Sequence, residues 1–147
     1  MNVRAATVAL ALMAAVPGVR AQADGFPAGY AFDKPRVLAQ QLVWGRLHGV
    51  RLLVLACRER GDTQAATAYA DWLESQSAPV AAAQRALSRH YFRMDAAPME
   101  AIDAALKLKP RLDIPDDELA AGCASLPEAL AAPRYDLERY YQERLTQ

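Results

Sequence analysis

The sequence predicts an all-α fold, a compact bundle of about five or six helices around one long central helix. The helical pattern is longest between Asp33 and Gly61, where apolar residues cover most of the circumference. Alternating spacings of four and three place five of them on one face: Val43, Leu47, Val50, Val54 and Cys57. A helix with so wide an apolar band needs other helices packed around it. The chain also lacks a long run of β-branched residues, which favours helix throughout.

The first 23 residues have the pattern of a secretory signal peptide. Arg4 supplies a short positive region, an apolar run follows over residues 5–16, and Ala21 and Ala23 are the small residues that a signal peptidase reads. We expect cleavage after Ala23 and export, with the periplasm as the favoured compartment. No stretch is long enough to cross a bilayer, so no transmembrane segment is predicted.

The mature chain would cover residues 24–147, which is enough for one domain and too little for two. We expect an extended N-terminal arm over 24–33, with Phe26, Tyr30 and Phe32 against the bundle, and a single helical domain over 34–147. The whole chain has 17 Lys and Arg against 17 Asp and Glu, so its charge gives no reason to expect a nucleic-acid partner.

Capping residues and prolines divide the rest of the domain. Asp33 is the expected N-cap of the long helix, and Gly61 its left-handed end. Asp62 or Thr63 caps the next helix, and Pro79 suits the first position of the third. The pattern predicts later helices over 63–76, from 79 through Arg93, and over 98–108, 116–125 and 135–145. A capping-box spacing predicts a further short helical segment over 125–133.

The turn at Gly61 and Asp62, followed by Ala66 and Tyr69, resembles the inner turn of a tetratricopeptide hairpin. The resemblance covers one repeat, roughly Val50 to Leu73. Such arrays need about three stacked repeats, and the sequence has no second copy. We therefore expect a generic helical hairpin here.

Cys57 and Cys123 are the only cysteines, and both lie on predicted core faces. In an oxidising compartment, two buried cysteines favour one disulfide, which would join the end of the long helix to the fifth helix. Two buried free thiols are the alternative. Neither CxxC nor CxxCH occurs, so the sequence favours neither a redox pair nor covalent haem.

Arginines supply most of the candidate interaction residues. Arg85, Arg89 and Arg93 recur at spacings of four beside Phe92, a pattern that could dock a partner bearing carboxylates or phosphates. The alternative is a solvated face with ion-pair partners such as Asp71 or Glu74.

Arg46 is a further candidate because it shares an angular sector with Val43 and Leu47. It would either extend its head group to solvent over a buried stem or anchor a buried carboxylate pair.

His48 and His90 are the only histidines, and a hydrogen-bonded structural role is the simpler expectation for each. His48 lies one turn from Arg51 and joins the candidate interaction residues. HExxH and HxxxH spacings are absent, so no metal site is predicted. No Ser–His–Asp constellation can be assembled, and no GxSxG, phosphate-loop or dinucleotide motif occurs, so no catalytic residue and no cofactor is predicted.

These features favour a non-enzymatic interaction protein of the inhibitor, immunity or adaptor type, with another periplasmic protein as its partner. Two alternatives remain. One is a small-ligand binder or enzyme with a site between helices, around Arg46, His48 and His90 or Tyr91. The other is a periplasmic protein resembling a chaperone.

Overall fold

The computed structural model describes residues 27–147, and every regular element in this part of the chain is helical. The elements are α1 (Pro35–Glu59), α2 (Thr63–Ser75), α3 (Ser77–Phe92), α4 (Met99–Ala105), α5 (Asp116–Ala131), the short 3-10 helix η1 (Pro133–Tyr135) and α6 (Leu137–Leu145). The predicted all-α bundle with one disulfide is confirmed. The predicted signal peptide and Phe26 lie outside the described residues. None of the described helices combines the length and hydropathy that a membrane span requires.

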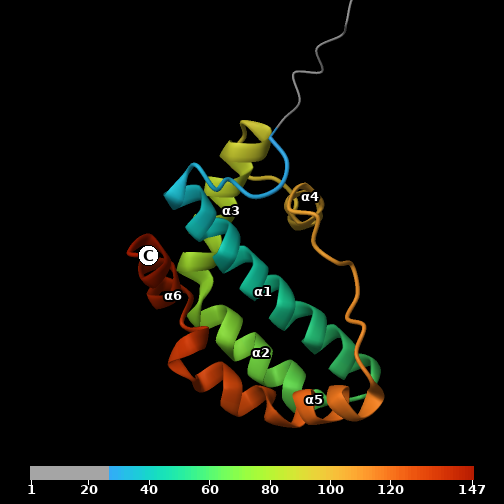
Figure 1. Cartoon of the computed structure of the whole chain (residues 1–147). Coiled ribbons are helices and arrows are strands. Elements are labelled where there is room, and N and C mark those ends of the chain that lie inside the picture. Colours follow the sequence, from blue (N-terminus) through green and yellow to red (C-terminus); the bar gives the residue numbers. More distant parts are fainter. Residues whose placement is uncertain (1–26) are drawn as a thin grey trace, which may run out of the picture.

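α1 is the central helix, as predicted. It packs against α2, α3, α5 and α6, while α4 packs on α3. Figure 1 shows α1 running the length of the bundle, with α3, α4 and the arm near its start and α5 near its end. The face predicted from spacing is buried: Val43, Leu47, Val50, Val54 and Cys57 are each 5% exposed or less.

The two ends of α1 differ in how well local sequence predicted them. Lys34, not Asp33, is the N-cap, and no side chain caps this end. Gly61 terminates the helix at φ +79°, a conformation that glycine adopts without steric cost. The N–H of Gly61 donates to Arg58 and that of Asp62 to Cys57, at 2.9 and 3.0 Å. The Asp62 carboxylate then caps α2 by accepting from the Ala65 N–H at 2.8 Å, as predicted.

The prediction that Pro79 occupies the first position of the third helix was correct only in part. Gln76 alone separates α2 from α3, and Pro79 lies in the third position of α3 rather than the first. N–H groups in a first turn lack intrahelical acceptors, so proline is tolerated at either position. The Gln76 carboxamide oxygen accepts from the Leu137 N–H at 2.8 Å and so ties this junction to the start of α6.

α5 is one helix, so the predicted division at Ser125 is wrong. Pro127 lies inside it, and the Ser125 hydroxyl donates to the Gly122 carbonyl at 3.2 Å instead of capping a new segment. Leu126 and Leu130 are buried on the two sides of Pro127. This packing holds the helix together across the missing N–H.

α4 ends earlier than predicted. Lys107 adopts φ 56°, and its N–H donates to Ala104 while that of Leu108 donates to Asp103. This is the same pair of bonds that closes α1, here with a lysine in the left-handed position. The chain from Leu106 onward therefore leaves the helix and runs along the outside of α1 (Figure 1).

The disulfide joins Cys57 at the end of α1 to Cys123 in α5, with a Cα–Cα distance of 5.6 Å. Both residues are buried, which confirms the predicted position of the bridge. α1 and α5 approach closely beside it, because a Cβ on Gly122 would lie only 3.3 Å from the Leu53 side chain.

The described arm residues are held mainly through their backbone. Gln41 accepts from the Ala31 N–H at 2.9 Å and donates to the Gly29 carbonyl at 3.2 Å and the Tyr91 hydroxyl at 2.6 Å. Tyr91 itself donates to Gly29 at 2.7 Å. The prediction that Phe32 lies against the bundle is wrong, since this side chain is 79% exposed. Gln41 is the residue that sets the path of the arm.

Replacing Gln41 with leucine should therefore release the arm. We expect Gln41→Leu to lower the free energy of unfolding by about 2 kcal/mol, because the Ala31 N–H loses its acceptor while the Gly29 carbonyl and the Tyr91 hydroxyl each lose a donor. Limited chymotrypsin digestion should cut faster after Tyr30, next to the Ala31 N–H that Gln41 holds, and denaturant unfolding should measure the loss of stability. Tyr91→Phe, which removes one hydroxyl and keeps the carboxamide, is the matched control with a smaller expected loss. Equal digestion of Gln41→Leu and the wild type would contradict this role.

Candidate functional site

Arg46 lies half-buried on α1 and faces two tyrosines, not a carboxylate. Its guanidinium carbon lies 3.6 Å from the ring centroid of Tyr140 and 5.9 Å from that of Tyr135. One N–H donates to the backbone carbonyl of Arg134. Within the described residues no ion pair involves Arg46, so the expected carboxylate partner is not there. Cation–π contacts hold this guanidinium instead.

The arginine stripe on α3 does not remain a single face. Arg85 and Arg89 are exposed on the helix, but Arg93 ends it in the left-handed conformation at φ 55°. Arg89 pairs with Asp95 at 2.7 Å, not with Asp71 or Glu74. Phe92 is half-buried and packs against the core. A role of these residues in partner binding stays a prediction.

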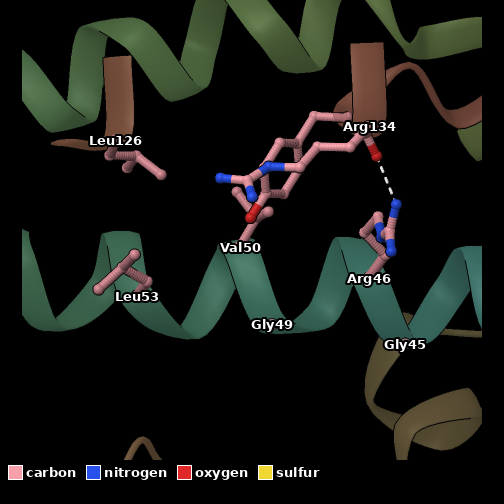
Figure 2. A pocket seen from close by; sticks show the side chains of 8 residues that line it. Gly45, Arg46, Gly49, Val50, Leu53, Leu126 and Arg134 are labelled. Atoms are coloured by element: carbon pink, nitrogen blue, oxygen red, sulfur yellow. Dashed lines mark hydrogen bonds between the residues drawn. The ribbon is translucent and has the colours of Figure 1, made fainter. Parts of the chain in front are cut away.

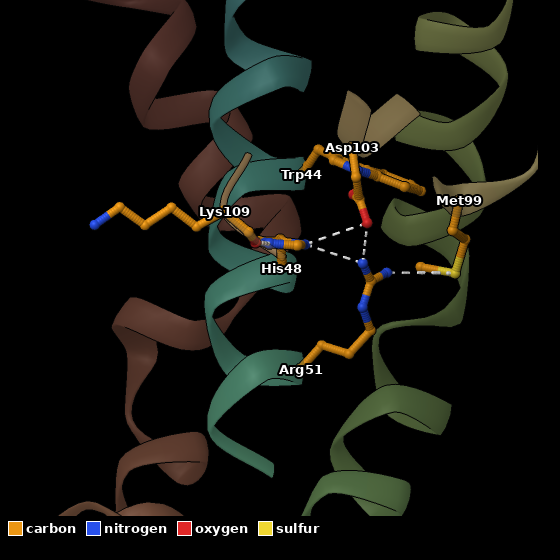
Figure 3. Close-up of polar contacts among 6 residues, drawn as sticks. All are labelled: Trp44, His48, Arg51, Met99, Asp103 and Lys109. Atoms are coloured by element: carbon orange, nitrogen blue, oxygen red, sulfur yellow. Dashed lines mark hydrogen bonds and ion pairs between the residues drawn. The ribbon is translucent and has the colours of Figure 1, made fainter. Parts of the chain in front are cut away.

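His48 belongs to a polar cluster that links α1 to α4 and to the chain that follows α4. Its Nδ1 lies 2.9 Å from Arg51 Nη2 and 3.3 Å from Asp103 Oδ2, and its Nε2 lies 2.7 Å from the Lys109 carbonyl. Arg51 forms an ion pair with Asp103, whose other oxygen accepts from Trp44 Nε1 at 2.8 Å. Figure 3 shows these side chains converging on the Asp103 carboxylate.

The donors and acceptors in this cluster assign the His48 tautomer. A carbonyl can only accept, so Nε2 carries the hydrogen and donates to Lys109. A guanidinium can only donate, so Nδ1 accepts from Arg51. In this tautomer both ring nitrogens have partners within the cluster.

A hollow of about 610 Å³ opens on the solvent side of this cluster. His48, Arg51 and Asp103 form part of its wall, and Leu52, Leu55, Met99 and Leu108 give it an apolar lining. A second hollow of about 320 Å³ shares Leu52, Leu55 and Pro110 with it. A third, of about 260 Å³, shares Tyr69 and Met99. We call these three hollows together the groove.

Among the described residues, Tyr69 in the groove and Tyr91 and His90 outside it have shifted pKa values. Burial raises the pKa of Tyr69, and the cation of Arg51 partly opposes that rise. Burial also raises the pKa of Tyr91, against the hydrogen bond from Gln41. For His90, burial lowers the pKa and Lys34 lowers it further, while Asp33 acts in the opposite direction. His90 stacks edge-on against Tyr91 at 4.8 Å, far in sequence from His48 and outside its cluster.

Asp103 and Trp44 are the residues that sequence reasoning missed. Asp103 directly follows Ile102, which is fully buried in the core. Trp44 is fully buried next to the predicted face of α1. Trp44 and Asp103 are 59 residues apart in the chain, so no local spacing pattern could predict the hydrogen bond between them. Among the described residues, no group of three or more His, Cys, Asp or Glu side chains is arranged to hold a metal ion.

Comparison of the chain with protein-family models, with curated proteins and with solved structures finds no match. The functional argument therefore depends on the geometry of this chain alone.

Proposed function

We propose that this chain is an exported, non-enzymatic interaction protein that binds an apolar segment of another periplasmic protein in the groove. The observation that carries the proposal is the continuity of the three hollows, which share apolar lining residues from α1 across to α2 and α3. Leu55 lies in two of them and is 47% exposed. Apolar side chains collected in a groove are typical of surfaces that receive a peptide segment.

The state of the polar cluster favours binding over catalysis. Both Asp103 oxygens and both His48 nitrogens already have partners within the cluster. A general base or nucleophile needs an atom that can reach a substrate, and these atoms are committed to one another. The cluster supports one wall of the groove and keeps α4 in place against α1.

Charges at the groove define the partner more closely. Arg58 and Glu100 both line the large hollow, and neither has an ion-pair partner among the described residues. A segment that fits has apolar side chains at its centre, an acidic residue facing Arg58 and a basic residue facing Glu100. Such complementary rim charges set orientation more than affinity.

The compartment is part of the proposal. The pattern of residues 1–23 and a disulfide between buried cysteines are both typical of exported proteins, because bridges persist in oxidising compartments. Intact-mass analysis of the protein purified from the periplasm tests this, with Asp24 expected as the first residue.

Site-specific photo-crosslinking tests the groove directly. A photoreactive amino acid replaces Leu55 in one variant and Met94 in a control variant, in cells that produce the chain naturally. The two side chains are 47% and 48% exposed, so the comparison isolates position rather than accessibility. We expect one discrete protein adduct from position 55 and none from position 94. Adducts at 94 alone, or at neither position, would overturn the proposal.

The crosslinked partner, once purified, allows a second test. Calorimetry should show that Leu55→Glu weakens binding about tenfold or more, because it places a charge in an apolar contact. Met94→Glu adds the same charge outside the groove and should bind like the wild type. If Arg89→Ala weakens binding while Leu55→Glu does not, the α3 arginines are the interface and the groove is not.

A further inference from the structure

A separate pocket lies on the opposite side of α1 from the groove, between α1, α5 and η1. Its volume is about 360 Å³, and Gly45 and Gly49 lie along its α1 wall (Figure 2). Val50, Leu53 and Leu126 supply apolar surface, and Arg46, Arg134 and Tyr135 occupy one end. We call this the Arg46 pocket.

The two glycines explain why this space is open. They are four residues apart on α1 and so lie on the same face of the helix. A Cβ at Gly49 would meet no atom within 4 Å, and one at Gly45 would meet only the Tyr30 hydroxyl, at 3.8 Å. No neighbouring side chain has filled the space above Gly49, which leaves room for a small molecule.

The charged residues lining the pocket are both cations. Among the residues that the structure describes, no acidic side chain lines the pocket, and neither Arg46 nor Arg134 has a carboxylate partner. Arg46 uses one N–H for the Arg134 carbonyl, whereas a guanidinium offers five. The guanidinium of Arg134 lies 5.2 Å from the Tyr135 ring centroid, and Figure 2 shows this side chain extending toward Val50.

A third guanidinium, that of Arg144, lies over the same tyrosine ring as Arg46. Arg144 lies 4.8 Å from the ring centroid of Tyr140, the same ring that Arg46 stacks on at 3.6 Å. The Nε of Arg144 is buried and has no hydrogen-bond partner. The tyrosine faces offset part of the repulsion among these cations, and an oxyanion at the pocket would offset more of it.

We propose that the Arg46 pocket binds a small molecule with an apolar body and a single oxyanion head, a carboxylate or a phosphate monoester. The planar guanidinium groups match either head in a bidentate geometry. The body would lie over Gly49 against Val50, Leu53 and Leu126, and the head would meet Arg46 and Arg134. The volume suits a ring or short chain with its head group.

NMR titration of the ¹⁵N-labelled mature chain tests the proposal with four added compounds. Benzoate and phenyl phosphate present the two heads on the same ring. Benzyl alcohol keeps the ring and removes the charge, and sodium chloride at equal ionic strength controls for salt. We expect benzoate, phenyl phosphate or both to shift the Gly45 and Gly49 amide signals saturably, with benzyl alcohol at least about tenfold weaker.

Three variants connect binding to the pocket. Arg134→Gln should weaken binding about tenfold, while Arg85→Gln, the same charge change on α3, should leave it unchanged. Gly49→Leu fills the pocket with a side chain that has room on the helix, so it should abolish binding while the chain stays folded. Equal binding of benzoate and benzyl alcohol would overturn the proposal. Unchanged affinity for benzoate and phenyl phosphate in both Arg134→Gln and Gly49→Leu would also overturn it. The absence of a saturable shift with either anion would do the same.

Discussion

Replacing both cysteines with alanine should lower the free energy of unfolding by about 4 kcal/mol, the largest effect expected from any change considered. The bridge closes a loop with a sequence separation of 66, and cross-linking so long a loop removes much conformational freedom from the unfolded chain. It also fastens the end of α1 to α5, where both cysteines are buried. Denaturant unfolding of the double variant, Cys57→Ala with Cys123→Ala, and of the oxidised wild type measures the difference.

The reduced wild type is the control for this experiment. Alanine also removes buried sulfur, so part of the loss in the double variant is lost packing. Unfolding of the wild type in reductant isolates the covalent bond and should give a loss close to that of the variant. A loss below about 1 kcal/mol in both would mean that α1 and α5 stay together through packing alone.

Removing the Asp103 carboxylate should have the second largest effect. We expect Asp103→Ala to lower the free energy of unfolding by about 3 kcal/mol, because two donors lose their acceptor at once. One is the indole N–H of Trp44, a fully buried side chain, and the other is the guanidinium of Arg51. The side chains of Arg51 and Asp103 are 20% and 15% exposed, so solvent screens their ion pair only in part. Thermal or denaturant unfolding measures it.

The exposed pair between Arg89 and Asp95 provides the matched control. Its side chains are 65% and 76% exposed, so Asp95→Ala should cost less than about 1 kcal/mol. Asp103→Asn keeps one oxygen for Trp44 but replaces the other with an amide nitrogen that cannot accept from Arg51, so its loss should fall between those of Asp103→Ala and Asp95→Ala. An Asp103→Ala variant no less stable than Asp95→Ala would show that the cluster contributes little to the fold.

Local sequence was sufficient wherever a feature depended on neighbours in the chain. Gly61 ended α1 because only a residue that tolerates positive φ fits there, and Asp62 capped α2 through a residue three positions away. The periodicity of α1 placed Cys57 on the buried face, and Cys123 was assigned to the core face of the fifth helix. Together with the even cysteine count, that was enough to predict the bridge.

Local rules failed where packing outweighed them. A proline and a capping-box spacing at Ser125 predicted a break, yet buried Leu126 and Leu130 keep α5 continuous through Pro127. Phe32 was expected to be buried because it is a large apolar residue, yet the arm is placed by Gln41, a polar residue ten positions beyond Ala31. Sequence alone gave no weight to Gln41, because its role depends on Gly29 and Tyr91 being beside it.

The helical class, the central helix, its left-handed end and the bridge could all be predicted from residue patterns, because each follows from period, composition or contacts a few residues apart. The two surfaces on which the functional proposals depend form only when the helices pack together. Asp103 meets Arg51 across 52 residues, and Arg46 meets the Arg134 carbonyl across 88. Such pairings depend on how helices pack against one another, and no spacing within a single helix carries that information.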